Sequence, residues 1–210
     1  MVTQLAAAAW IRRWTERIGE QKQFLTDLDA AIGDADHGIN MDRGLREVMV
    51  KLPVATAPEL APLFKMVGMT LLSKVGGSSG PLYGTFFLKL AEAAGPRTEL
   101  TGAELVTVLA SGVTGVGRRG NSVPGEKTML DALVPAVAAL QSAVERGEDL
   151  CLALSAASAA ANAGVAATVP MQATKGRASY LGPRSIGHQD PGATSSAYLI
   201  AALREVLCPG

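Results

Sequence analysis

Amphipathic stretches of helical length follow one another along almost the whole chain of 210 residues. In each stretch apolar residues recur every three or four positions, which places them on one face of an α-helix. No alternation of apolar and polar residues is sustained between turn residues, as a half-buried strand would require. The sequence therefore predicts an all-α fold of eight or nine helices, over residues 3–19, 20–32, 38–51, 58–75, 80–94, 101–117, 127–146, 148–170 and 193–207.

The composition is typical of closely packed helices. Hydrophobic residues make up 48% of the chain but aromatic residues only 4%, so most of the apolar surface consists of small side chains. The 19 Lys and Arg residues balance 19 Asp and Glu residues, which argues against a basic surface for nucleic acid or an anionic membrane. We expect a single domain over residues 1–210 that contacts neither directly.

Other features favour a soluble, cytoplasmic protein. The apolar run 5–11 has no positive charge before it and Arg12 and Arg13 after it, the reverse of the order in a secretion signal. We expect no uncharged stretch long enough to span a bilayer. Cys151 and Cys208 are too few for a disulfide framework, and their number fits a reducing compartment.

Local signals predict where some helices begin, bend and end. Thr101 and Glu104 have the spacing of a capping box. Pro135 lies inside an apolar helical run and predicts a kink, whereas Pro170 predicts that a helix ends close by. Gly33 is expected to end a helix in the left-handed conformation.

The turn at residues 28–40 (LDAAIGDADHGIN) carries three carboxylates and neither Lys nor Arg. Asp29 falls in the last turn of a predicted helix, and Asp34 and Asp36 follow in the loop. A hard divalent cation would relieve their mutual repulsion. Because the twelfth position from Asp34 is Leu45 instead of Glu, a Ca²⁺-binding EF-hand is excluded. The sequence favours Mg²⁺, with a solvated acidic turn as the alternative.

Two predicted helix starts are suited to phosphate. Ser78 and Ser79 lie among glycines in the segment 74–85 (KVGGSSGPLYGT), and residues 37–40 (HGIN) open the helix after the acidic turn. Helix starts present free backbone amides and the positive end of the helix dipole, which attract anions. No P-loop motif occurs. An ordinary loop between helices is the alternative for the serine-containing segment.

Two further segments are rich in glycine or lack helical periodicity. Residues 115–128 (GVGRRGNSVPGEKT) contain G-x-G-x-x-G, but a dinucleotide-binding fold would need flanking βαβ units that the sequence does not predict. We therefore expect these glycines in a loop, with Gly120 free to approach a ligand. Residues 171–196 form the longest stretch without helical periodicity, which is typical of binding loops. There, Arg177 is suited to pair with phosphate or, alternatively, is an ordinary surface residue.

The sequence offers no candidate for covalent catalysis. His37 and His188 are the only histidines, and a hydrogen-bonded structural role is favoured for each over a proton shuttle. No G-x-S-x-G, no H-E-x-x-H and no paired Cys and His spacing occurs.

Four segments together resemble the ADP-binding L subunits of phosphoenolpyruvate-dependent dihydroxyacetone kinases. They are GDADHG (33–38), GGSSGPLYGTFF (76–87), PGEKTM with DALVP (124–135), and KGRASYLG with RSIGHQDPGATS (175–195), and they occur in the family's order. The resemblance implies an eight-helix antiparallel barrel with ADP or ATP at one end and two Mg²⁺ ions between carboxylates and phosphates.

The resemblance also implies roles for individual residues. The positions that match Mg²⁺ ligands are Asp29, Asp34 and Asp36. The positions that match nucleotide contacts are His37, Gly38, Ile39, Asn40, Ser78, Ser79, Gly120, Met129, Arg177, Asp190, Pro191 and Gly192. The chain departs from the family pattern at Ser78, where Ala is familiar, at Glu126, where Asp is familiar, and at Thr174, where a basic residue is familiar.

In such systems, subunit K holds dihydroxyacetone covalently on a histidine, and subunit L donates the phosphoryl group from a tightly held nucleotide. A phosphoprotein subunit M then rephosphorylates ADP in place. Because 210 residues correspond only to the nucleotide domain of the fused ATP-dependent enzymes, we expect dihydroxyacetone to bind on another chain. The resemblance thus implies a phosphotransferase subunit of glycerol and dihydroxyacetone metabolism that is active only with its partners, and we expect a homodimer.

Two alternatives stay open. One is the L subunit of a kinase that consumes free ATP. The other is a noncatalytic module that senses ADP or Mg²⁺ and docks a partner such as a transcription regulator.

Overall fold

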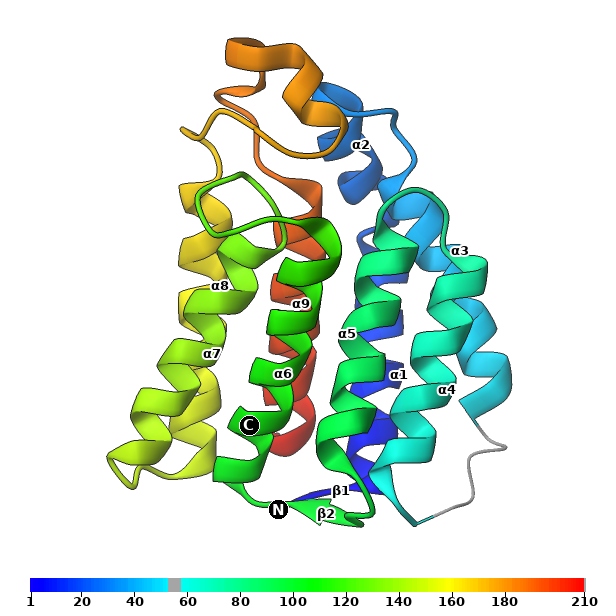
Figure 1. Cartoon of the computed structure of the whole chain (residues 1–210), viewed down its shortest axis with the longest axis vertical. Coiled ribbons are helices and arrows are strands. Elements are labelled where there is room, and N and C mark those ends of the chain that lie inside the picture. Colours follow the sequence, from blue (N-terminus) through cyan, green and yellow to red (C-terminus); the bar gives the residue numbers. More distant parts are fainter. Residues whose placement is uncertain (53–57, 210) are drawn as a thin grey trace.

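The structure is a computed structural model that describes residues 1–52 and 58–209, and nearly all of its regular structure is helical (Figure 1). The elements are β1 (Val2–Thr3), α1 (Gln4–Glu20), α2 (Lys22–Ile32), α3 (His37–Lys51), α4 (Leu60–Lys74), α5 (Ser79–Ala94), β2 (Glu99–Leu100), α6 (Gly102–Gly120), α7 (Leu130–Glu145), α8 (Leu150–Ala167), the 3₁₀ helix η2 (Arg177–Ser185) and α9 (Pro191–Leu207). The predicted all-α fold is confirmed. The short antiparallel pair β1–β2 and the helix η2 were not predicted.

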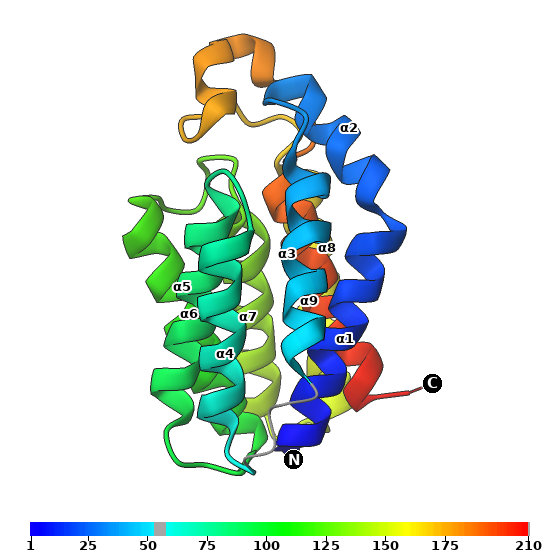
Figure 2. The same ribbon diagram turned by 90° about the vertical axis from the view of Figure 1, so that its right-hand side faces the viewer.

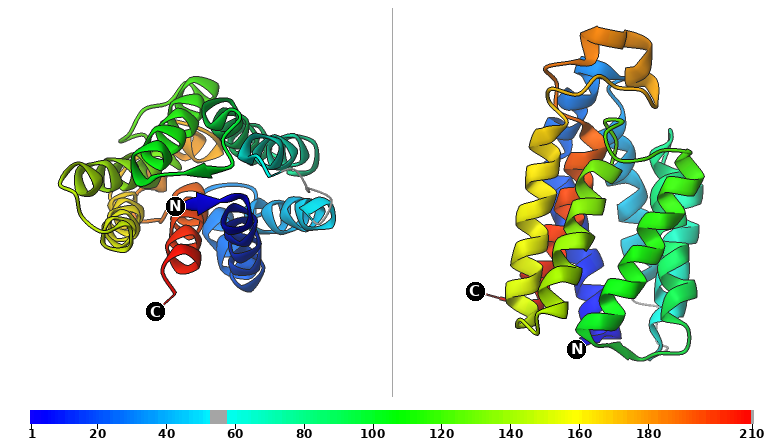
Figure 3. Two further views of the ribbon diagram at one scale, coloured as in Figure 1. Left: turned by 90° about the horizontal axis from the view of Figure 1, so that it is seen from below. Right: turned by 60° about the vertical axis from the view of Figure 1, so that its left-hand side comes forward.

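The helices close into a ring in which neighbours run in opposite directions (Figures 1 and 3). Helices α1 and α2 follow one another as a single bent segment (Figure 2). Around the ring, α1 contacts α3, each helix from α3 to α8 contacts the next, and α9 returns to contact α1. Over the described residues, the predicted eight-helix antiparallel barrel is confirmed, with α1 and α2 counted as one segment. This alternation places the starts of α3, α5, α7 and α9 at the same end of the ring.

Two tryptophans of α1 close the ring against α9. Trp10 and Trp14 are buried, and their indole N–H groups donate to the backbone oxygens of Leu199 (2.8 Å) and Ser195 (3.2 Å). Phe87 of α5 packs against both indoles, with ring centroids 5.9 and 5.8 Å away. Six aromatic residues form one buried cluster among α1, α4 and α5, in which each buries a large apolar area: Trp10, Trp14, Phe64, Tyr83, Phe86 and Phe87.

Most local signals in the sequence match the observed helix ends. Thr101 and Glu104 form the predicted capping box at the start of α6. Helix α8 ends at Ala167, shortly before Pro170. Helix α7 runs on through Pro135. Helix α9 begins at Pro191, earlier than predicted, because proline suits the first position of a helix.

The prediction of a loop around the glycines at 115–120 is wrong. Gly115, Gly117 and Gly120 belong to α6, and Asn121 caps the end of this helix in the left-handed conformation. A Cβ atom at Gly115 would lie 2.6 Å from the Cγ of Lys89 on α5. Here glycine serves the close approach of two helices.

The structure also corrects the expectation about the cysteines. Cys151, at the start of α8, and Cys208, after α9, form a disulfide. This bridge lies at the end of the ring opposite the starts of α3, α5, α7 and α9, and both ends of the described chain lie there as well (Figure 1).

Helix α8 does not match the expectation about apolar stretches. It belongs to an uncharged run from Leu150 to Thr174 and, by length and by its mean hydropathy of 1.6, it is apolar enough to cross a membrane. In the structure α8 packs between α7 and α9. The core helix of a soluble protein passes the same test of length and composition.

Replacing Cys208 with Ser is expected to destabilise the fold while leaving the opposite end of the ring unchanged. The bridge joins residues 57 positions apart, and opening a loop of that length costs about 4 kcal/mol through the entropy of the unfolded chain. Thermal unfolding without reductant should give a Tm about 10 °C below that of the wild type. The Tm of the wild-type protein in dithiothreitol should fall to the same value. Two free thiols in the non-reduced wild type would contradict the bridge.

Candidate functional site

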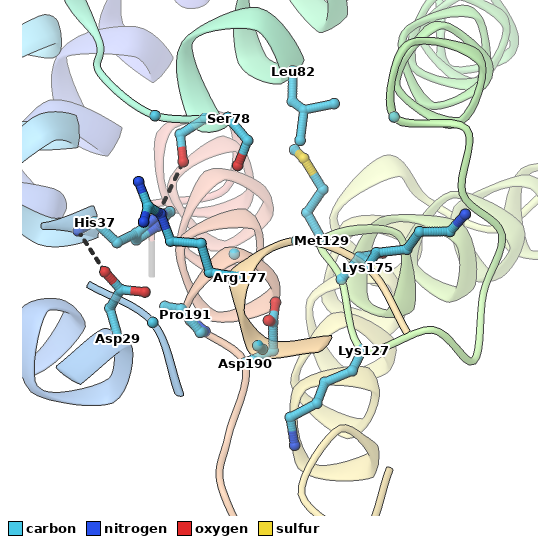
Figure 4. A pocket seen from close by; sticks show the side chains of 18 of the residues that line it. Asp29, His37, Ser78, Leu82, Lys127, Met129, Lys175, Arg177, Asp190 and Pro191 are labelled. Carbon is cyan, nitrogen blue, oxygen red and sulfur yellow. Dashed lines mark hydrogen bonds between the residues drawn. The ribbon is translucent and has the colours of Figure 1, made fainter. Parts of the chain in front are cut away.

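Four helix starts surround a cavity of about 430 Å³ at one end of the ring (Figure 4). His37, Ser79 and Pro191 are the first residues of α3, α5 and α9, and Met129 directly precedes α7. The first backbone N–H groups of a helix lack partners within it and, with the helix dipole, attract anions. The cavity has the size of a small-molecule site and suits an anionic ligand.

Asp29 holds the acidic turn in place. It lies in the last turn of α2 and is buried. Its Oδ2 accepts the backbone N–H groups of Asp36 (2.8 Å) and His37 (3.1 Å). The carboxylate therefore fixes the turn against the start of α3.

Gly33 does not adopt the predicted left-handed conformation. Its φ is −141°, and Ala35 instead has a positive φ of 61°. A Cβ atom at Gly33 would lie 2.1 Å from Oδ1 of Asp29. Glycine is required here because the Asp29 carboxylate packs directly against the backbone.

The three carboxylates form a group that fits a divalent cation. Oxygen atoms of Asp29, Asp34 and Asp36 lie within 4.8 Å of one another. Burial, together with the neighbouring Asp34 charge, raises the pKa of Asp36. A cation between the groups would reverse this effect, and a partial cage of hard oxygen donors beside a cavity that suits anions is the environment that Mg²⁺ prefers.

Arg177 reaches this group from a segment beside the cavity. Residues 168–190 connect α8 to α9, and we call them the cap segment; they include η2, which contacts α2 (orange in Figure 1). The Nε of Arg177 forms an ion pair with Oδ2 of Asp34 (3.1 Å). Lys175 also lines the cavity. The cap segment therefore brings positive charge to the acidic turn.

A buried chain of hydrogen bonds links three of the helix starts. The Nδ1 of His37 lies 3.0 Å from Oγ of Ser79, and its Nε2 lies 2.9 Å from Oγ of Ser195. The Tyr83 hydroxyl bonds Ser195 (2.7 Å) and Ser196 (2.9 Å). Burial lowers the pKa of His37 to about 4, so the ring is neutral and has one donor and one acceptor nitrogen. The predicted hydrogen-bonded role of His37 is confirmed, and the residue lies at the predicted helix start.

Asp190 caps α9 from inside the protein. Its Oδ2 accepts the N–H of Ala193 (2.7 Å), and its own N–H donates to Oγ1 of Thr168 (3.0 Å). Burial raises the pKa of Asp190 to about 7; Asp131 adds to the shift, and the Ala193 N–H opposes it. Because Asp190 also lines the cavity, its charge state is part of what a ligand meets.

The structure brings most of the predicted site residues to this one cavity. Those that line it are Asp29, Asp34, Asp36, His37, Ser78, Ser79, Gly120, Met129, Arg177, Asp190, Pro191 and Gly192. Gly38, Ile39 and Asn40 are not among its lining residues. A Cβ at Gly38 would lie 2.0 Å from the backbone oxygen of Lys22, Ile39 is exposed, and the Asn40 side chain accepts a hydrogen bond from Arg43.

Sequence reasoning missed several residues that line the cavity. They include Leu82, Tyr83, Val116, Arg119, Lys127 and Lys175. Each lies within or next to a motif that the sequence analysis singled out, so proximity to a motif was the available signal. The departures at Glu126 and Thr174 lie together, because the Thr174 N–H donates to the backbone oxygen of Glu126 (3.4 Å).

Comparison with known proteins identifies the family. The family model described as the DAK2 domain matches residues 31–205. The chain belongs to the DAK2 domain family. Over 194 residues it is 48% identical to the "PEP-dependent dihydroxyacetone kinase, ADP-binding subunit DhaL" of Escherichia coli (strain K12), with 92% of both chains covered. Over 207 residues it is 41% identical to the "PTS-dependent dihydroxyacetone kinase, ADP-binding subunit DhaL" of Lactococcus lactis subsp. lactis (strain IL1403), covering 99% of this chain and 100% of the relative. The resemblance drawn from the motifs is confirmed.

Two longer proteins contain a similar DAK2-like region. The chain is 35% identical over 187 residues to the triokinase/FMN cyclase of Homo sapiens, covering 89% of this chain and 32% of that protein. The crystal structure of the dihydroxyacetone kinase from C. freundii in complex with AMP-PNP and Mg²⁺ matches with a TM-score of 0.74 and 29% identity, covering 94% of this chain and 33% of that one. The chain spans about a third of the length of these two proteins.

Asp190→Asn is expected to stabilise the nucleotide-free protein at pH 8. The variant keeps an oxygen for the Ala193 N–H but buries no charge. The folded-state pKa of Asp190 (about 7) lies above its ordinary value of 3.8, so the buried charged carboxylate destabilises the fold. This loss of stability is complete above pH 7 and disappears as the pH falls toward 4. Tm should therefore rise by about 3 °C or more at pH 8, and this gain should shrink at pH 5.

The matched control is Asp149→Asn at the start of α8. Asp149 is also an N-cap, accepting the N–H of Cys151 (2.8 Å), but it is exposed. No gain at pH 8 is expected there. A gain for Asp190→Asn that is equal at pH 5 and pH 8 would contradict the assignment.

Proposed function

We propose that this chain is the ADP-binding, phosphoryl-transferring subunit of a phosphoenolpyruvate-dependent dihydroxyacetone kinase. The observation that carries the proposal is the meeting of Asp29, Asp34 and Asp36 with four helix starts at one cavity. Relatives that align over nearly their whole length are named as subunits of this kind. A carboxylate group beside anion-attracting amides suits a diphosphate bound through a divalent cation.

We propose that the three carboxylates hold Mg²⁺, two ions as the resemblance implies. Bound Mg²⁺ supplies positive charge that neutralises the phosphate oxygens during phosphoryl transfer. Asp29 orients the turn through its two backbone hydrogen bonds. With a cation held at Asp34, the guanidinium of Arg177 would be available to a phosphate oxygen.

The other walls suit the rest of a nucleotide. The N–H groups at the start of α5 donate to phosphate, and His37 holds the Ser79 hydroxyl at that helix start. Leu82, Val116 and Met129 offer apolar surface to a base. We assign no covalent catalytic role to this chain, because positioning and charge neutralisation supply the catalysis that phosphoryl transfer needs.

The partners follow from the same proposal. A dihydroxyacetone-binding subunit K presents the substrate at the cavity end of the ring, and a phosphoprotein subunit M rephosphorylates ADP in place. The homodimer, the transcription regulator as a further partner, the single domain over residues 1–210, the cytoplasmic location and the absence of direct contacts to nucleic acid or membrane stay predictions.

ADP and Mg²⁺ together are expected to stabilise the protein more than either alone. At a ligand concentration of 100 times Kd, the gain is about 2.7 kcal/mol, or about 5–10 °C in Tm. Asp34→Asn should lose most of this gain because it removes a carboxylate from the cation group. Asp27→Asn is the matched control, since Asp27 lies on the same helix as Asp29 but is exposed. Equal gains in both variants, or no Mg²⁺-dependent gain in the wild type, would rule out the proposed site.

Reconstitution is expected to distinguish the phosphoryl donor. With subunits K and M, phosphoenolpyruvate and its phosphotransferase proteins, catalytic amounts of ADP should support sustained phosphorylation of dihydroxyacetone. With subunit K and ATP alone, each bound nucleotide should support about one turnover, because exchange is slow. Sustained turnover with ATP alone would instead identify an ATP-consuming kinase. Failure of all mixtures, with partner binding intact, would identify a noncatalytic sensor.

A further inference from the structure

Lys127 is a buried cation that the proposed function does not use. Lys127 is only 2% exposed and lies in the loop between α6 and α7, two positions before Met129. Its φ is +62°, a conformation that a residue with a side chain rarely adopts. In Figure 4 its side chain points away from that of Lys175. The loop therefore takes up an unfavourable backbone conformation and buries a charge at the same residue.

The ammonium group of Lys127 binds three backbone oxygens. Its Nζ donates to the carbonyl of Thr168 (2.8 Å), to that of Met171 (3.2 Å) and to that of His188. An ammonium has three N–H donors, so each has one acceptor. Burial lowers the pKa of Lys127, and the Asp190 charge opposes this shift.

These acceptors lie at both ends of the cap segment. Thr168 and Met171 belong to its beginning, where it leaves α8, and His188 to its end, where it enters α9. Two other bonds join the ends directly, from the Asp190 N–H to Oγ1 of Thr168 (3.0 Å) and from the Gly187 N–H to the Val169 oxygen (2.8 Å). Of the groups described here, only Lys127 ties both ends to the loop that carries Met129.

Two other links between this loop and the cap segment are weaker. The Thr174 N–H donates to the backbone oxygen of Glu126 at the long distance of 3.4 Å. Lys175 and Glu126 form an ion pair of 3.8 Å whose side chains are 31% and 22% exposed. Partly exposed pairs of this length contribute little. Lys127 is therefore the main connection between the two segments.

Both joined segments reach the cavity. Met129 and Thr128 line it from the loop, and Arg177, ion-paired with Asp34, lines it from the cap segment. A buried charge with three carbonyl partners is costly to break, because any opening leaves polar groups unsatisfied. A hydrophobic residue of similar length would fill the same space without holding either end.

We propose that Lys127 is a positioning residue that holds both ends of the cap segment against the loop that carries Met129. Through this attachment, ligand contact at the loop is coupled to the placement of Arg177 over the carboxylates. The attachment through the Lys127 hydrogen bonds is inferred from the geometry alone, whereas its effect on ADP rests on the proposed function. In the structure, moving the cap segment away from the cavity requires breaking the Lys127 bonds.

Lys127→Met tests the proposal, with Lys51→Met as the matched control. Lys51 is exposed and donates a single bond, to Thr70 (3.2 Å), near the end of α3. In nucleotide-free protein, trypsin cleavage after Lys175, Arg177 or Arg184 is expected to be about tenfold faster in Lys127→Met, since local opening becomes easier. The control should match the wild type.

The second measurement is the dissociation of ADP in the presence of Mg²⁺. Lys127→Met should raise the dissociation rate about tenfold and leave the association rate within about twofold, because the loosened cap segment affects residence time. A merely structural role would lower Tm without changing either local cleavage or residence time, and that result would overturn the proposal.

Lys127→Arg covers the case in which Lys127→Met does not fold. The guanidinium keeps the charge, but its flat fork cannot direct one N–H to each of three carbonyls around a point. The same changes are expected, smaller in size, and wild-type behaviour in both measurements would overturn the proposal. If wild-type protein binds no ADP, the proposed function fails while the cleavage experiment still tests the attachment. If it binds ADP but Lys127→Met releases it at the wild-type rate, only the coupling fails.

Discussion

The alternation of direction around a closed ring determines where this protein attracts anions. It places four helix starts at one end, but it places the ends of α2, α4, α6 and α8 there too, and helix ends carry the opposite partial charge. The sequence offsets three of these negative ends with cations, and α2 has no basic residue in its last turn. Lys74 lies in the last turn of α4, Arg118 and Arg119 lie in that of α6, and Lys127 binds the Thr168 carbonyl at the end of α8. Helices α3, α5 and α9 have no acidic residue in their first turns. These three helix starts thus keep their attraction for anions, and under the proposed function the acidic turn adds the ligands for a cation.

The same residues connect the apolar core to this end of the ring. Trp14 donates to the backbone oxygen of Ser195, and the Ser195 hydroxyl bonds both His37 and Tyr83. The position of α9 against α1 therefore also sets the distance between the starts of α3 and α9. Because the chain of bonds is buried and fully paired, a small shift of one helix leaves an unsatisfied polar group. Such coupling keeps the helix starts at fixed separations, which a site built from backbone amides requires.

The sequence predicted the parts of the structure that depend on local pattern. Helical periodicity located the helices, and the spacing of Asp29, Asp34 and Asp36 located the acidic turn. Features that depend on contacts between distant segments could not be predicted. Gly115 of α6 lies in a segment with the pattern of a loop, and only its close approach to Lys89 of α5 shows that it allows close packing. Lys127 has the pattern of a solvated loop residue, and its acceptors lie 41 to 61 positions further along the chain.

Both ends of the described chain lie at the opposite end of the ring from the cavity, beside the Cys151–Cys208 bridge. A peptide linker attached to either terminus would therefore emerge where it cannot obstruct the cavity mouth. In the human triokinase/FMN cyclase and the C. freundii kinase, the similar region makes up about a third of a longer polypeptide. Gene fusion to a neighbouring domain is geometrically undemanding for this architecture: the tether raises the effective concentration of the attached domain and asks no rearrangement of the helices that form the site.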